Sequence, residues 1–212
     1  GGITGSFMTG AMARALAVSE YNAAMGKIVA APTAGSCGIM PGCLVSVMKE
    51  RNISREKVIE GMFTAAGFGM VIAKRASVSG AQGGCQAECG SAAAMTAAAM
   101  VEMMDGSPKQ AADACAIALK NQLGLVCDPV AGLVEIPCIK RNVAGIMVAF
   151  SSADMALAGI ESRIPADEVI DAMKEVGDSL PCALKETAQG GLANTPTAKR
   201  MKESVFGAQN RD

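Results

Sequence analysis

Large aromatic side chains are almost absent from this chain, which restricts the kind of core it can build. Its 212 residues include five Phe, one Tyr and no Trp, whereas 24 are Gly and 15 are Met. The core must therefore consist of Ala, Val, Ile, Leu and Met, and small residues allow helices to approach one another closely. Half of the residues are hydrophobic and the net charge is -1, so the chain is not intrinsically disordered.

Helical signals recur along the chain, whereas the alternating patterns typical of strands are nearly absent. Helix starts are indicated at Ser54, at Ser107 (S-P-K-Q, with Pro at the first helical position) and at Pro165. After Pro165, an acidic first turn and an apolar stripe at helical spacing lead to a predicted stop at Gly177. Further helices are predicted over residues 4–24, 89–104 and 142–162. We therefore expect an all-α fold, a compact helical bundle with Gly/Pro-rich functional loops that carry cysteines.

Four Gly/Pro-rich segments separate these helices: residues 31–42, 77–90, 123–138 and 188–196. Loops held by a rigid scaffold are where function concentrates, and the first three contain cysteine. No repeat or linker divides the chain, so residues 1–212 are expected to form one domain. Because the sequence begins without Met, we also expect an upstream segment to be missing.

Composition excludes several function classes. The chain has no histidine, so it cannot by itself assemble a Ser-His-Asp triad or a histidine-ligated zinc site. Its slightly negative net charge argues against nucleic-acid binding. The most apolar stretch, residues 143–160, is barely long enough to span a membrane and contains Asp154, which favours a buried helix. Eight cysteines without a visible secretory signal predict reduced thiols in the cytoplasm.

The cysteines divide by their surroundings. Cys43, Cys115 and Cys182 lie in helical or apolar sequence and are expected to be small buried hydrophobes. The Cys85–Cys89 pair is only weak support for zinc, because no second pair completes a zinc ribbon. Cysteines on glycine-rich loops also allow an iron–sulfur cluster. Three thiolates would leave one iron of a [4Fe–4S] cluster without a protein ligand, and such an iron is a Lewis acid.

Several segments point to one family. GKIVAAPTAGSCGIMPG, SVSGAQGGCQAECGSAAAM, NQLGLVCDPVAGLVEIPCIKRN and KETAQGGLA closely resemble the alpha chain, or catalytic domain, of iron–sulfur-dependent L-serine dehydratases. The resemblance extends over nearly the whole chain. It implies an all-helical domain that converts L-serine to pyruvate and ammonia with a [4Fe–4S] cluster and without pyridoxal phosphate. By the same resemblance, the cluster ligands are Cys85, Cys127 and Cys138, while Cys89 is left out.

The resemblance and the residue chemistry together suggest substrate-binding positions. Thr33, Ser36 and Cys37 could grip the substrate carboxylate through hydroxyl and loop N–H groups, and Ser79 and Gly80 could do the same. Ordinary loop capping is the alternative for each of these positions.

Charged and amide side chains near the same motifs complete the predicted site. Glu88 would hold the substrate ammonium, or would be a solvated loop charge. Asp128 and Asn142 would orient the cluster cysteines by hydrogen bonds, with helix capping as the alternative for Asn142. Lys27 and Arg141 could pair with carboxylates, but solvated positions are favoured.

The general base is not apparent in the chain. Histidine would suit that task, and the resembled family carries a Ser/His-rich motif in its other domain, a separate beta chain in two-subunit members. We therefore expect L-serine as substrate, a beta subunit or N-terminal domain that supplies the base, a hetero- or homo-oligomer, and no activity from this chain alone. Three alternatives stay open: cysteine desulfidase-like β-elimination, a non-catalytic iron–sulfur carrier, and a bundle whose cysteines are only structural.

Overall fold

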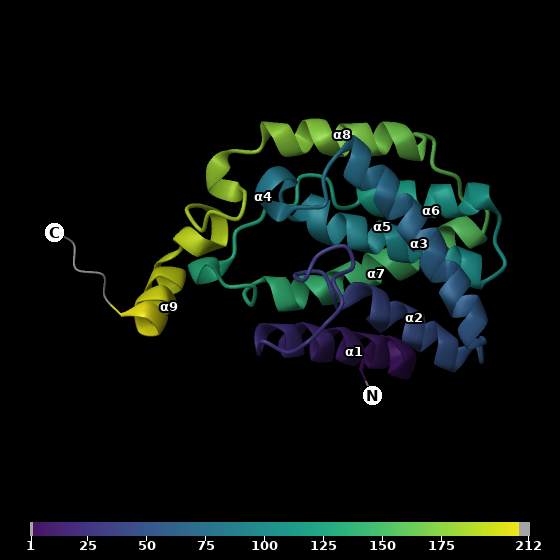
Figure 1. The fold of residues 1–212 in the computed structure, drawn as a ribbon, viewed down its shortest axis with the longest axis horizontal. Helices are drawn as coiled ribbons and strands as arrows, with labels where there is room; N and C mark the ends of the chain where they lie inside the picture. Colours follow the sequence, from purple (N-terminus) through teal and green to yellow (C-terminus); the bar gives the residue numbers. More distant parts are fainter. Residues whose placement is uncertain (1, 208–212) are drawn as a thin grey trace.

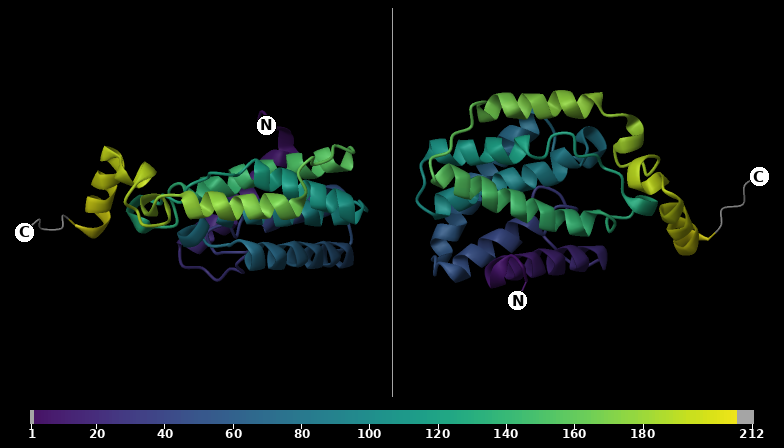
Figure 2. Two further views of the ribbon diagram at one scale, coloured as in Figure 1. Left: turned by 90° about the horizontal axis from the view of Figure 1, so that it is seen from above. Right: turned by 180° about the vertical axis from the view of Figure 1, so that it is seen from behind.

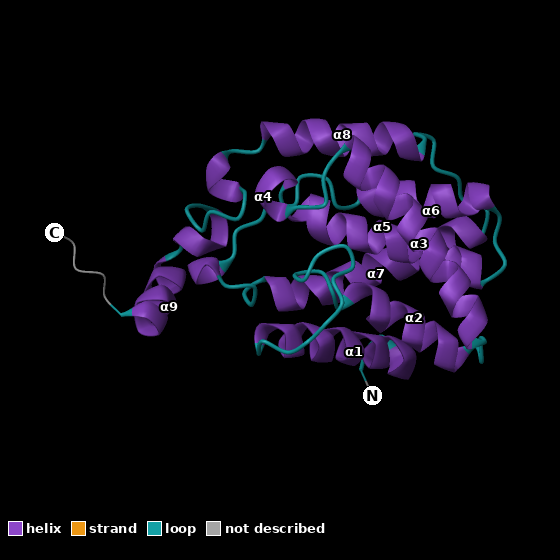
Figure 3. Cartoon of the chain, in the orientation of Figure 1, coloured by secondary structure: helices purple, strands orange, loops and turns teal. Residues whose placement is uncertain are grey.

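The computed structural model describes residues 2–207, and within that range the chain forms helices and loops but no β-sheet (Figure 3). The α-helices are α1 (Gly5–Ala23), α2 (Ile39–Glu50), α3 (Arg55–Arg75), α4 (Gly80–Gly83), α5 (Ser91–Met103), α6 (Pro108–Lys120), α7 (Cys138–Leu157), α8 (Ala166–Ser179) and α9 (Pro196–Phe206). A π-helix (Gln86–Gly90) precedes α5, and short 3₁₀ helices cover Val130–Gly132, Cys182–Leu184 and Gly191–Asn194. The predicted all-α fold is confirmed.

Helix α5 lies at the centre of the bundle and contacts α2, α3, α6 and α7 (Figure 1). Helix α8 runs along one edge, against α6 and α4, and α1 runs along the opposite edge beside α2 and α7. Two further views show that α9 extends away from the bundle at one end (Figure 2). The loops that carry the cysteines lie between these helices.

The composition of α5 explains its central place. Twelve of its 13 residues are buried, and six of these are Ala. Short side chains let the neighbouring helices pack close to the α5 backbone. On α3, Gly61 faces α5 so closely that a Cβ atom there would lie 2.9 Å from the backbone oxygen of Ala99 and 2.9 Å from Cγ of Met103.

This contact predicts opposite effects for two glycines of the same helix. Ala at either position should gain roughly 0.5–1 kcal/mol from helix propensity. At Gly67 a Cβ would meet nothing within 4 Å, so Gly67→Ala should stabilise the chain. At Gly61 the added methyl meets backbone, and overpacking costs about 1–3 kcal/mol. Urea unfolding followed by helical circular dichroism should show Gly61→Ala to be the less stable variant, and equal stability would contradict the close approach.

Most predicted helix starts are confirmed. Ser54 caps α3 and accepts a hydrogen bond from the Lys57 N–H at 3.2 Å. Ser107 and Gln110 form a reciprocal capping box at the start of α6, with Pro108 at the first position. Pro165 precedes α8, whose first turn is acidic. Local capping chemistry therefore marks these ends correctly.

Other boundaries differ from the prediction. Helix α8 continues past Gly177 to Ser179, because this glycine serves close packing: a Cβ there would lie 2.9 Å from Cα of Gly83. Helix α7 begins and ends earlier than predicted. The segments expected to be loops are partly helical, since α2 starts within 31–42, α4 and the π-helix occupy much of 77–90, and a 3₁₀ turn and the start of α9 fall in 188–196. Helix α9 was not predicted.

The apolar stretch 143–160 forms most of α7, whose buried face includes Ile146, Ala149 and Ala153. Across residues 2–207, no helix combines the length and the apolar character needed to cross a membrane.

Candidate active site

The cysteine loops converge on one buried region. Cys85, Cys89 and Cys127 form a small cluster with Ile39 and Ala92, separate from the main core. Cys138, also buried, lies at the first residue of α7. Burial, followed by the neighbouring charges of Cys85 and Glu88, raises the pKa of the Cys138 thiol to about 12. The same influences raise the pKa of Cys127, so the three predicted cluster cysteines lie close enough to interact electrostatically.

A buried amide holds two of these loops together. The Gln86 side chain is fully buried; its Nε2 donates to the Met173 carbonyl at 2.9 Å, and its Oε1 accepts from the Gly124 N–H at 2.9 Å. The Gln86 N–H also donates to the Leu125 carbonyl at 2.9 Å. These bonds bring the Cys85 segment to the segment that leads into Cys127. Sequence reasoning missed Gln86, since nothing local distinguishes it from a surface glutamine.

Arg141 is not at a solvated face, contrary to prediction. Its Nη2 pairs with Asp128 Oδ1 at 2.9 Å, and its Nη1 donates to the Val126 carbonyl at 2.8 Å. Asp128 Oδ2 accepts the Leu192 N–H at 2.7 Å. Asp128 therefore holds the arginine and the C-terminal segment. The hydrogen bond between the Cys85 and Cys89 sulfurs, and then the Arg141 charge, lower the pKa of the Cys85 thiol against the effect of burial.

Asn142, near the start of α7, joins its own helix to the 33–38 loop and does not act as a helix cap. Its Oδ1 accepts the Gly38 N–H at 2.9 Å, and its Nδ2 donates to the carbonyls of Gly35 at 2.8 Å and Cys138 at 2.9 Å. The first-turn backbone of Cys138 is thereby fixed relative to the 33–38 loop. The contact is made to the Cys138 backbone carbonyl, and the role of Asn142 in orienting a cluster ligand stays a prediction.

A chain of hydroxyl groups leads to Glu88. Thr33 Oγ1 donates to Glu88 Oε1 and lies 3.0 Å from Ser36 Oγ; because the threonine has one hydroxyl hydrogen, Ser36 is the donor in that pair. Burial raises the pKa of Glu88. The hydrogen bond from Thr33 partly offsets this increase, and the charge of Glu186 adds to it. Glu88 is therefore not a solvated loop charge.

Gly80 leaves room beside these groups. A Cβ at Gly80 would lie 2.9 Å from Cys127 Sγ, 3.2 Å from Glu88 Oε2 and 3.4 Å from Glu186 Oε2. Because glycine has no side chain, the Cys127 thiol and the carboxylates of Glu88 and Glu186 can all lie close to this position. Sequence reasoning missed Glu186, whose N–H donates to the Cys127 carbonyl at 2.8 Å. Ser79, just before Gly80, is half-buried, and its N–H donates to Ser77 Oγ at 3.0 Å.

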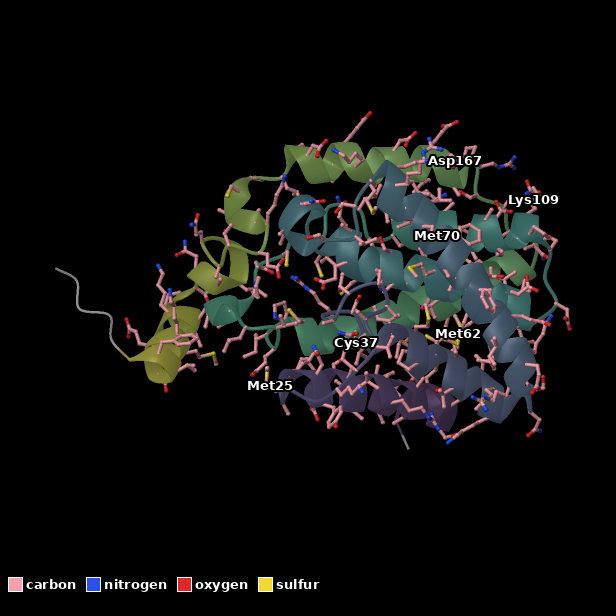
Figure 4. All side chains as sticks on the ribbon, viewed as in Figure 1. Met25, Cys37, Met62, Met70, Lys109 and Asp167 are labelled. Carbon is pink, nitrogen blue, oxygen red and sulfur yellow. The ribbon has the colours of Figure 1, made fainter. Side chains whose placement is uncertain are left out.

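Cys37 lies near the start of α2, in the interior of the molecule (Figure 4). It directly follows Ser36 in the 33–38 loop. It also lines an apolar cavity of about 570 Å³, together with Met40, Leu44 and Met62. Burial raises the pKa of its thiol. Lys27 is exposed at the same cavity, as predicted for a solvated position.

Three cysteines outside the site were predicted to be small buried hydrophobic residues. Cys43 and Cys115 are buried in the helical core, as expected. Cys182 is exposed, so its predicted burial is wrong; it lies in the 3₁₀ turn after α8, outside the bundle core. Cys89, which the prediction left out, is buried with its sulfur 3.3 Å from that of Cys85.

Within residues 2–207, no three His, Cys, Asp or Glu side chains meet tightly enough to hold one metal ion. Thiolate is the ligand that an iron–sulfur cluster requires. Buried thiols on separate loops, with Arg141 beside them, fit such a cluster by their donor chemistry.

The fold and site together define an all-helical protein with a thiol-rich site on converging loops. Residues 1–193 match the family described as "Serine dehydratase alpha chain". A probable L-serine dehydratase alpha chain from Bacillus subtilis (strain 168) is 58% identical over 205 residues, which cover 97% of this chain and 68% of the relative. The chain therefore belongs to the serine dehydratase alpha-chain family.

Two further relatives show how much of each protein the similarity covers. The L-serine dehydratase alpha chain of Peptoniphilus asaccharolyticus is 56% identical over 204 residues, covering 96% of this chain and 70% of the relative. The L-serine dehydratase TdcG of Escherichia coli (strain K12) is 46% identical over 181 residues, covering 84% of this chain but 40% of the relative.

Proposed function

We propose that this chain is the alpha chain of an L-serine dehydratase, a lyase that converts L-serine to pyruvate and ammonia in the cytoplasm. The observation that carries the proposal is that Cys85 and Cys127 share one buried cluster near Glu88, with Cys138 electrostatically coupled to Cys85, in a chain so similar to proteins named L-serine dehydratase. Eight free cysteines support a reducing compartment.

Cys85, Cys127 and Cys138 are the proposed ligands of a [4Fe–4S] cluster, and the proposal needs no pyridoxal phosphate. When bound, a cluster with one iron free of protein ligands supplies a Lewis acid that assists loss of the substrate hydroxyl. Around these cysteines, Arg141 and Asp128 fix the Cys127 segment, and Asn142 fixes the turn at Cys138. Their proposed task is to orient the ligands.

Glu88 is proposed to bind the substrate ammonium. It is half-buried and already hydrogen-bonded to Thr33, so its carboxylate is oriented before the substrate arrives. On ammonium binding, Thr33 would exchange its bond to Glu88 for one to the substrate carboxylate, with Ser36 behind it. Ser79, Gly80 and the Cys37 loop are the other proposed carboxylate contacts.

The base that removes the α-proton is proposed to come from a partner, either a beta chain or a fused domain, in a hetero- or homo-oligomer. The chain has no histidine. Relatives named as alpha chains, and a longer relative named L-serine dehydratase of which this chain covers 40%, support this part of the proposal. We expect pyruvate formation only when such a partner is added.

Mössbauer spectra of the anaerobically reconstituted, iron-57-labelled chain test the proposal. Adding L-serine should shift the signal of one iron out of four. Glu88→Gln should load the cluster but respond at roughly 10–100-fold higher L-serine, because a hydrogen bond to a charged group contributes about 1.5–3 kcal/mol. Glu175→Gln, on the exposed face of α8, is the matched control and should respond normally.

Three other outcomes would redirect the proposal. A response to L-cysteine with sulfide release, but none to L-serine, would favour β-elimination from cysteine. A cluster that ignores both amino acids even with the beta chain present would indicate an iron–sulfur carrier. Absence of any cluster would contradict the assigned ligands.

A further inference from the structure

Cys85, a proposed cluster ligand, forms a close thiol pair with Cys89, which the proposed reaction does not use. Their sulfurs are 3.3 Å apart, and each residue is only 2% exposed. Cys85 immediately precedes the π-helix and Cys89 lies within it, so both side chains project to one side of the same turn. The Gln86 hydrogen bonds to α8 and to Gly124 hold this turn in place.

The pair needs little movement to become covalent. A disulfide requires a sulfur separation of about 2.05 Å, so the two atoms must approach by a little more than about 1 Å. Both cysteines belong to the same turn, so this approach takes place within one short segment. The other two cysteines of the site, Cys127 and Cys138, belong to separate segments, so a disulfide from Cys85 to either would join two segments instead of closing within one turn.

We propose that Cys85 and Cys89 are an oxidative modification site, at which hydrogen peroxide forms a reversible intrachain disulfide. One sulfur attacks a peroxide oxygen, the O–O bond breaks, and sulfenic acid and water result. The second sulfur attacks the sulfenic sulfur, the S–S bond forms, the S–O bond breaks, and another water leaves. In total, two thiols are oxidised and one peroxide is reduced to two waters.

The consequence for the enzyme rests on the proposed function. The disulfide removes Cys85 from the set of cluster ligands, so the oxidised chain cannot take up iron until a thiol reduces it. It also stops Cys85 from proceeding to sulfinic acid, which thiols do not reverse. Cys89 would thus act as a resolving cysteine that preserves the site while the cluster is absent.

Two features of the chain shape the test. Cys182 is exposed and would react first, so Cys182→Ser serves as the background. Because the pair is buried, the test uses hydrogen peroxide, a small oxidant, and the bulkier glutathione disulfide should react far more slowly. Both cysteines lie in one tryptic peptide, residues 76–109, which contains no other cysteine. The bond is therefore read as the loss of two hydrogens from that peptide.

The experiment treats the iron-free chain with hydrogen peroxide, blocks remaining thiols, and maps peptides without reduction. Cys182→Ser should show the disulfide, lose iron uptake, and recover uptake after dithiothreitol. Cys182→Ser/Cys89→Ser should load iron before oxidation, then accumulate sulfinic acid at Cys85 and fail to recover. The inference is overturned if Cys85 pairs with Cys127 or Cys138, or if the Cys89 variant recovers equally.

Peptide mapping of the iron-free chain separates this inference from the function. If the disulfide forms but no variant ever binds iron, the cluster proposal fails and the modification site stands. If iron loads normally and the peptide keeps both thiols, the modification site fails alone.

Discussion

Serine in place of Cys85, Cys127 or Cys138 is expected to abolish cluster loading and, with the partner present, pyruvate formation. A serine hydroxyl stays protonated at neutral pH and is a poor ligand for iron in a cluster, which requires thiolate. The loss should exceed the roughly 10–100-fold reductions caused by changes to groups that only orient metal ligands. Iron and sulfide content, together with the visible absorption of the reconstituted chain, measure it directly.

Cys115→Ser is the matched control, because Cys115 is buried like the three ligands but lies in α6 within the main core. Burying a hydroxyl there costs about 1–3 kcal/mol in stability without touching iron. If this variant also loses the cluster, unfolding rather than ligation explains the result. If Cys127→Ser or Cys138→Ser keeps a full cluster, the ligand assignment is wrong.

Cys85 requires one additional variant. The Cys89 sulfur lies only 3.3 Å away and could replace the lost ligand. Residual iron in Cys85→Ser that disappears in Cys85→Ser/Cys89→Ser would demonstrate such replacement. Comparing the two variants therefore shows whether Cys89 can bind the iron that Cys85 normally binds.

Local signals predicted the bundle well. Ser54, Ser107 and Pro165 mark helix starts because capping depends on residues three or four positions apart. The burial of Cys43 and Cys115 followed from their apolar neighbours. The helix end predicted at Gly177 was wrong because this glycine packs against a distant segment, and a local capping rule does not include such packing.

The contacts around the candidate site could not be predicted from the sequence. Asn142 bonds to Gly35, 107 positions earlier, and Gln86 bonds to Met173, 87 positions later. Arg141 looked like a surface cation because its partner Asp128 lies on a separate loop. Such pairings depend on the tertiary arrangement, so composition and periodicity give no sign of them.

The Asp128–Arg141 pair should have the largest effect on stability of any ion pair described here. Their side chains are only 4% and 15% exposed, and Asp128 also accepts the Leu192 N–H. Arg141→Met leaves the carboxylate buried without its cation, which should cost about 3–5 kcal/mol. Asp128→Asn removes the charge but keeps an oxygen for Leu192, so its cost should be smaller.

A double-mutant cycle on the iron-free chain, measured by urea unfolding, tests this prediction. Asp128→Asn/Arg141→Met should be less destabilised than the sum of the single variants by about 0.5–3 kcal/mol. Arg75→Met is the matched control, since Arg75 pairs with Asp171 at exposed positions and such pairs contribute about 0–1 kcal/mol.

Faster exchange of the Leu192 amide in Asp128→Ala would show that the carboxylate also holds the C-terminal segment. If Arg141→Met costs no more than Arg75→Met, the buried pair does not hold the Cys127 segment in place, and its proposed role in orienting the cluster ligands fails with it.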